Sequence, residues 1–187
     1  AILRSAALAA SREFAVGGND AISALEALVK AGLSGKEAVD ALGAALVMAR
    51  IEGVDFSEAA NNLVQVMAQF GLKGSEATRV VDALVNASRL GIGTANDFAQ
   101  GLANVGATAR AMGLSLEETL ALLVILERRL GSAEEAGTVL NRMLLDLGEI
   151  AAKLGVPLRG LNGELRSAME VIGDVVEASR MLAPEWD

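Results

Sequence analysis

The sequence contains no cysteine, no histidine and no tyrosine. Without cysteine the chain can form neither disulfides nor thiolate sites. Without histidine and cysteine it also lacks the usual zinc ligands and the residues of the Ser-His-Asp and Cys-His nucleophile systems. We therefore expect no enzymatic activity, no cofactor and no bound metal, and we predict no catalytic, cofactor-binding or metal-binding residue.

Aromatic residues and prolines are scarce as well. Aromatic residues make up 3% of the chain, although hydrophobic residues make up 52% and the mean hydropathy is +0.42. Alanine and leucine, which favour helices strongly, supply much of this apolar content, and the only helix-breaking prolines are Pro157 and Pro184. The composition therefore favours helices.

Long hydrophobic runs are missing too. The most apolar uncharged stretch is 119–126, much shorter than the roughly 20 residues that a membrane-spanning helix needs. Because charged residues flank this stretch on both sides, we expect a buried helix in a soluble core. Residues 116–126 are apolar nearly all round, which predicts a central helix. A membrane-active pore segment is the less favoured interpretation.

Positive charge is outweighed by negative charge. The formal net charge is −8, and Arg128 and Arg129 form the only adjacent pair of basic residues. A protein that grips the phosphate backbone needs clustered lysine and arginine, so we expect no direct binding to nucleic acid.

A short motif recurs through the chain. It consists of glycine, an apolar residue, a helix-capping residue, two further residues and an acid. The six copies begin at Gly32, Gly53, Gly71, Gly91, Gly113 and Gly131, so successive copies lie 21, 18, 20, 22 and 18 residues apart. This period predicts short helices separated by turns at regular intervals.

Each position of the motif has a physical role. Glycine suits the left-handed residue that ends a helix, and a serine, threonine or aspartate can cap the next one. An acid three residues after the cap can complete a capping box. The expected caps are Ser34, Asp55, Thr94, Ser115 and Ser132. Their acids are Glu37, Glu58, Glu118 and Glu135, with Asp97 as a weaker variant. Lys73 breaks the pattern, so Ser75 is the alternative cap there.

Apolar residues recur every three or four positions between these stops, as in amphipathic helices that face a core. One such stripe is Val139, Leu140, Met143, Leu144, Leu147, Ile150 and Leu154. The methionines are expected to fill the core. We predict an all-α fold of eight or nine short helices in stacked helix-turn-helix pairs, as a solenoid or a compact bundle. The expected helices are 2–16, 20–31, 35–51, 56–70, 75–90, 95–112, 116–130, 133–154 and 164–182.

We predict a single helical domain over 1–187, and two further features of the sequence bear on it. Segment 155–163 carries turn-forming residues and Pro157, which predicts an irregular or hairpin-like connection. The acidic pairs Glu117–Glu118 and Glu134–Glu135 could act as acid and base. We interpret them instead as first-turn charges that the helix dipole stabilises.

Seven short segments occur in this order along the chain: 31–38 (AGLSGKEA), 76–84 (EATRVVDAL), 86–88 (NAS), 113–119 (GLSLEET), 135–140 (EAGTVL), 154–156 (LGV) and 161–166 (LNGELR). This ordered set resembles the core domain of phage tail tape measure proteins. The order and spacing agree from about Arg12 to Val176, although Gly43 and Ala107 stand where that family often has proline.

The resemblance implies a structural role in a phage tail. Proteins of this family lie in the tail tube lumen, set tail length and leave ahead of the DNA. The implied partners are tail-assembly chaperones, the tail tube protein and tail-tip or baseplate proteins. The implied locations are the virion tail and, during assembly, the host cytoplasm. Membrane contact is expected only during ejection, and a homo-oligomer is allowed. The chain would then be a fragment of a longer tape measure protein. The alternative is a generic or designed helical-repeat interaction module.

Overall fold

The chain is almost entirely helical in a computed structural model that describes residues 2–160, 163–164 and 166–182. Within these ranges no regular strand occurs, which confirms the all-α prediction. The helices are α1 (Ile2–Glu13), α2 (Gly18–Lys30), α3 (Gly35–Glu52), α4 (Phe56–Phe70), the short 3-10 helix η1 (Gly74–Glu76), α5 (Ala77–Leu90), α6 (Ala95–Ala111), α7 (Leu116–Leu130), α8 (Ala133–Lys153) and α9 (Ala168–Leu182).

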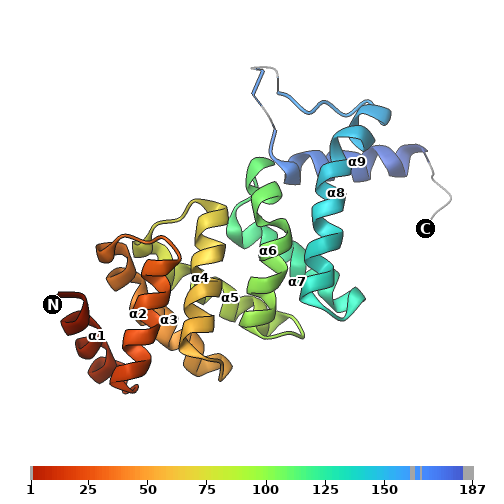
Figure 1. The fold of residues 1–187 in the computed structure, drawn as a ribbon. Helices are drawn as coiled ribbons and strands as arrows, with labels where there is room; N and C mark the ends of the chain where they lie inside the picture. Colours follow the sequence, from red (N-terminus) through yellow and green to blue (C-terminus); the bar gives the residue numbers. More distant parts are fainter. Residues whose placement is uncertain (1, 161–162, 165, 183–187) are drawn as a thin grey trace.

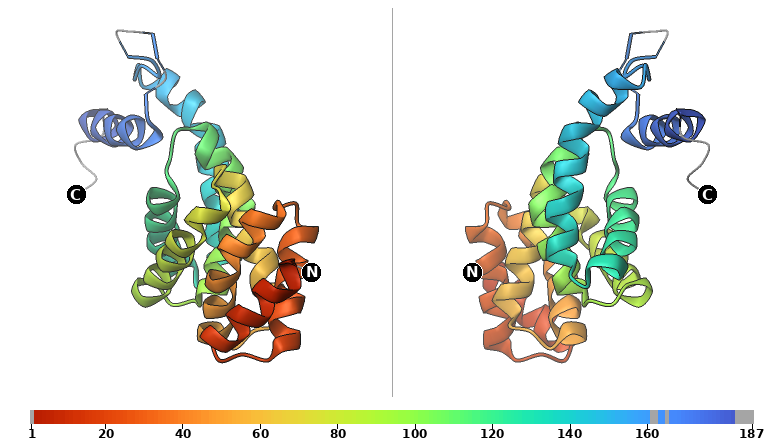
Figure 2. Two further views of the ribbon diagram at one scale, coloured as in Figure 1. Left: turned by 90° about the vertical axis from the view of Figure 1, so that its left-hand side faces the viewer. Right: turned by 90° about the vertical axis from the view of Figure 1, so that its right-hand side faces the viewer.

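The helices form two layers (Figures 1 and 2). In one layer α2, α4, α6 and α8 lie side by side, and in the other α1, α3, α5 and α7 do so. Nearly all contacts join a helix to the next one or to the one after that. This pattern is that of a helical solenoid, so the structure favours the first of the two predicted arrangements.

The core runs as one cluster through both layers. Its centre is α6, which contacts α4 and α8 within its layer and α5 and α7 in the other. Phe98 and Leu102 of α6 are fully buried. The prediction that 116–126 forms the central helix is wrong. α7 lies on the outside, and its Ile125 is 62% exposed, because α5, α6 and α8 cover only one face of it.

The glycine stops act as predicted at five of the six positions. Gly113, for example, has φ +78, and Gly32, Gly53, Gly71 and Gly131 are also left-handed. Gly91 is the exception, with φ −92. A Cβ there would overlap a carboxylate oxygen of Glu127 and lie 2.5 Å from Cζ of Phe98. Close packing, rather than backbone handedness, therefore requires glycine at 91.

All five predicted caps accept a hydrogen bond from the first turn of the next helix; they are Ser34, Asp55, Thr94, Ser115 and Ser132. The predicted acids behave less uniformly. Full capping boxes form with Glu37, Asp97 and Glu118. The predicted boxes at Glu58 and Glu135 are wrong, because neither carboxylate accepts a hydrogen bond from the backbone N–H of its cap residue. At Lys73 the backbone N–H donates to Glu76, so Ser75 is not the cap.

The two ends of the helical array depart most from the prediction. α1 ends at Glu13 rather than 16, because Ala15 takes a left-handed φ of +51. α9 begins at Ala168 rather than at 164. At this start the backbone N–H of Ser167 donates to the Glu170 carboxylate, and the backbone N–H of Glu170 donates to Ser167 Oγ. Before it, Arg166 N–H donates to the Leu158 carbonyl, and Gly160 N–H to that of Glu164. The described part of 155–163 is therefore hairpin-like, as predicted; Leu161 and Asn162 lie outside the described residues.

Replacing Ser115 by alanine is expected to lower the free energy of unfolding by about 1 kcal/mol. Ser115 Oγ accepts from the Glu118 N–H, and Glu118 in turn accepts from the Ser115 N–H at 2.8 Å. Chemical denaturation would measure the loss, with Ser179→Ala as a control that removes an exposed serine near the end of α9. Equal stability of the two variants would contradict the capping role of Ser115.

Candidate functional surfaces

The first acidic pair lies in the first turn of α7, as predicted. The guanidinium of Arg79 on α5 donates two hydrogen bonds to the carboxylate of Glu117, one to each oxygen, at 2.8 and 2.9 Å. This hydrogen bonding holds the pKa of Glu117 below its ordinary value. The backbone N–H and hydroxyl of Ser115 do the same for the pKa of Glu118. Both carboxylates are therefore held ionised by structural partners, which suits anchoring rather than proton transfer.

The second acidic pair, Glu134 and Glu135, is exposed in the first turn of α8. The acids Glu13, Asp40, Asp82 and Asp146 are also exposed. In the described ranges, no group of three or more acidic residues is placed to hold a metal ion. The absence of catalytic, cofactor and metal residues stays a prediction from the sequence.

One buried carboxylate was not predicted from the sequence. Glu127 on α7 is 1% exposed, and its oxygens accept from the backbone N–H groups of Ile92 (2.9 Å) and Gly93 (2.7 Å). The neighbouring Arg128 donates to the Leu90 carbonyl. These bonds fasten the loop between α5 and α6 to α7. A sequence signal existed, because Glu127 continues the buried stripe of Leu116, Leu120 and Leu123 at helical spacing.

A second polar cluster joins three helices. Asn96, at the start of α6, is 8% exposed and exchanges hydrogen bonds with Asn62 and Glu58 of α4. Its backbone N–H donates to Glu52 of α3 at 3.4 Å. These hydrogen bonds join α3, α4 and α6, so the cluster fixes the positions of the three helices relative to one another.

Apolar side chains reach the surface in several places. Met48 and Met67 are buried as predicted, but Met143, Met169 and Met181 are 40% or more exposed, so the core prediction is wrong for these three. Ile150 is also exposed, at 41%. A groove of about 400 Å³ between α5 and α7 is lined by Leu90, Val124 and Ile125 among others. Another of about 570 Å³ lies between α1 and α2. The described surface thus carries two apolar grooves and several exposed apolar side chains.

A family model for phage-related minor tail proteins matches residues 4–185. The chain belongs to this family. The resemblance inferred from the sequence is confirmed, and a structural role in a phage tail is favoured over a generic or designed repeat module. The features described above, which are polar contacts between helices and apolar grooves, agree with a structural role.

A curated relative is the tape measure protein of Pneumococcus phage Dp-1, which is 26% identical over 190 residues. The match covers 98% of this chain but only 16% of the relative, so the chain spans about a sixth of that protein's length. No solved structure matches the chain. In the part of the chain that the structure describes, no helix combines the length and hydrophobicity of a membrane-spanning segment.

Proposed function

We propose that residues 1–187 form one folded helical domain of a longer tape measure protein, which acts by assembly and catalyses nothing. The observation that carries this proposal is the match of nearly the whole chain to a short part of a tape measure protein. The family match over 4–185 supports the same conclusion. In this proposal the longer protein determines tail length and takes part in DNA ejection.

The fold suggests how such a domain contributes. A single helix of 187 residues would span roughly 280 Å at about 1.5 Å per residue. The longest described helix, α8, has only 21 residues, so this domain is not itself an extended rod. It adds a compact body to a longer protein, and its exposed apolar grooves are suited to binding other tail components.

We place the domain in the lumen of the tail tube in the virion, and in the host cytoplasm during assembly. Its proposed partners are tail-assembly chaperones, the tube protein and tail-tip or baseplate proteins. The net charge of −8 supports the absence of a direct grip on DNA, because like charges repel the phosphate backbone. Contact with a membrane would occur only during ejection.

The test is an in-frame deletion of this segment in its parent gene, followed by electron microscopy and infection assays. Shortened tails, absent tails or particles that fail to eject DNA are the expected results. Normal, infectious tails of unchanged length would refute the proposal. A second variant, Gly137→Leu in the full-length protein, keeps the number of residues and is expected to disrupt the fold, because a side chain at 137 would overlap the Gly101 backbone on α6. Comparing this variant with the deletion shows whether the tail requires the folded domain or only the length of chain that the domain supplies.

A further inference from the structure

α5 and α7 lie side by side and run in the same direction. Near their starts Arg79 of α5 is paired with Glu117 of α7, and near their ends Arg128 of α7 donates to the Leu90 carbonyl of α5. The groove of about 400 Å³ described above lies between the two helices. We call the surface around this groove the α5–α7 face. It lies along the side of the two-layer array (Figure 2).

The middle of the α5–α7 face is apolar. Leu90 of α5 is 60% exposed and Ile125 of α7 is 62% exposed, and both line the groove. Ala121, one turn before Ile125, is also exposed and lines the groove. Its small side chain leaves room for another helix to approach closely. Exposed apolar side chains gathered around a groove are typical of a protein–protein contact.

The charges on α7 are divided between its two ends. Glu117 and Glu118 lie in the first turn, whereas Arg128 and Arg129 lie in the last turn. Arg79 pairs with Glu117, but the ion pairs of the described residues include none with Glu118, Arg128 or Arg129. This placement stabilises α7 through its own dipole. It also gives the face an acidic end and a basic end.

One side of α7 carries this pattern in a line. Glu118, Ile125 and Arg129 are separated by seven and four residues, which is close to two turns and one turn of an α-helix. All three residues are exposed. This side of α7 therefore presents an acid, an apolar residue and a base, in that order along the helix.

A second copy of the chain is complementary to this face. When two α7 helices lie antiparallel, the acidic end of each meets the basic end of the other, and the two apolar middles meet. A parallel pair would instead bring like charges together. The complementarity follows from the direction of the helix, so it does not require one exact offset between the two copies. A patch that complements itself is what a two-fold symmetric contact needs.

We propose that two copies of this chain associate through their α5–α7 faces, with the two α7 helices antiparallel and each beside the groove of the other copy. The contact is isologous, so it closes after two copies. The apolar middle provides the buried contact, and the charged ends determine the direction in which the helices pair. This inference rests on the charge and exposure of one face, and it does not depend on the proposed function.

The first test is the mass of the 187-residue chain in solution, by sedimentation over roughly 10 μM to 1 mM. The average mass is expected to rise with concentration and to level off at that of a dimer. Ile125→Asp should weaken association at least about ten-fold, because a charge would be buried in the contact. Leu145→Asp is the matched control, since Leu145 is 67% exposed on α8, and it should leave association intact.

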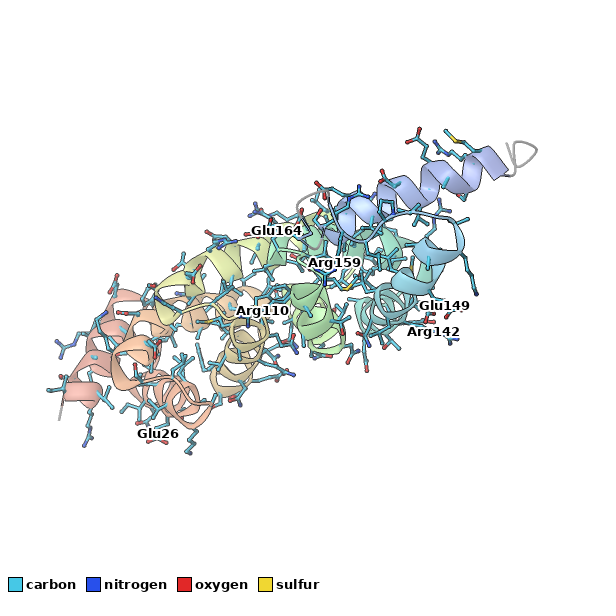
Figure 3. The ribbon with its side chains drawn as sticks, turned by 90° about the horizontal axis from the view of Figure 1, so that it is seen from above. Glu26, Arg110, Arg142, Glu149, Arg159 and Glu164 are labelled. Atoms are coloured by element: carbon cyan, nitrogen blue, oxygen red, sulfur yellow. The ribbon has the colours of Figure 1, made fainter. Side chains whose placement is uncertain are left out.

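The second test concerns the charged ends. Arg129→Glu should weaken association about five-fold at low salt, because each of the two acidic ends would then meet an acid. The effect should shrink at high salt. Arg142→Glu is the control for net charge: Arg142 is 86% exposed on α8, which belongs to the other layer (Figure 3). An equal effect of the two changes would contradict the proposed role of Arg129.

The direction of the pair can be tested with single cysteines, because the chain has none of its own. In the antiparallel pair Ala121→Cys, near the middle of α7, should join to its own copy through a short thiol-reactive cross-linker. Arg129→Cys, at the end of α7, should not. Equal cross-linking of the two variants would indicate a parallel pair and contradict the proposal.

Two results would overturn the proposed dimer itself. One is a wild-type chain that stays monomeric up to 1 mM, which would leave the α5–α7 face to a helix of another polypeptide. The other is association that Ile125→Asp leaves unchanged, which would place the contact elsewhere on the molecule. Circular dichroism and thermal melting of each variant would verify that it keeps its fold.

Discussion

Replacing Gly137 by alanine is expected to lower the free energy of unfolding by about 3 kcal/mol. A Cβ at this position of α8 would overlap the carbonyl oxygen of Gly101 on α6 and lie 2.9 Å from its carbonyl carbon. The overlapping atoms belong to the backbone of α6. No change of side-chain rotamer can relieve the overlap, so the two helices must move apart. Gly101 is restricted in the same way, because its own Cβ would meet the Ala133 carbonyl oxygen at 2.5 Å.

Gly148 provides the control within the same helix. Its Cβ would lie at ordinary contact distance, 3.7 Å from Leu158 Cδ1. Gly148→Ala should therefore stabilise the protein by up to about 1 kcal/mol, because alanine favours the helix over glycine. Urea denaturation of both variants would measure the difference. If Gly137→Ala were as stable as Gly148→Ala, the close crossing of α6 and α8 would be wrong.

Glu127→Ala is expected to destabilise the protein by about 3 kcal/mol. The change removes the charged acceptor of two part-buried backbone N–H groups, those of Ile92 and Gly93. A hydrogen bond to a charged group contributes about 1.5–3 kcal/mol. Hydrogen exchange at these two amides should also become faster, because the loop loses its attachment to α7. This local effect distinguishes a lost attachment from general loosening of the core.

Two comparisons sharpen the Glu127 experiment. Glu127→Gln keeps the shape of the side chain but presents an NH₂ group to one of the two donors, so its cost should be intermediate. Glu149→Ala removes a carboxylate whose side chain is 70% exposed, and should change stability by no more than about 0.5 kcal/mol. Unaltered exchange at Ile92 and Gly93 in Glu127→Ala would show that the carboxylate does not hold the loop.

The features predicted well from the sequence are those set by nearby residues. A cap, its acid and the preceding glycine lie within a few residues of one another, so Ser34 and Ser115 could be assigned without any tertiary information. Apolar periodicity gave the helices between the stops for the same reason. The predicted start of α9 was four residues too early, because the stretch before Ser167 pairs with residues 158–160 instead of forming helix.

The features predicted poorly depend on which helices become neighbours. α7 is apolar nearly all round, so its sequence did not indicate that neighbouring helices would cover only one side of it. The exposure of Met143 likewise follows from the place of α8 at the end of its layer, which periodicity cannot show. Gly91 does end α5, but the reason for glycine there is the close approach of Phe98 and Glu127 rather than a left-handed backbone. Long-range contact, rather than local propensity, decides each of these cases.

The two-layer order also determines how the chain would respond to a pulling force. Because each helix contacts chiefly its nearest two neighbours along the chain, the contact order is low, and folding is expected to be fast. Tension applied at one end would peel the terminal helices from the array one pair at a time, without first breaking contacts at the far end. We expect the same helices to refold pair by pair when the tension is released.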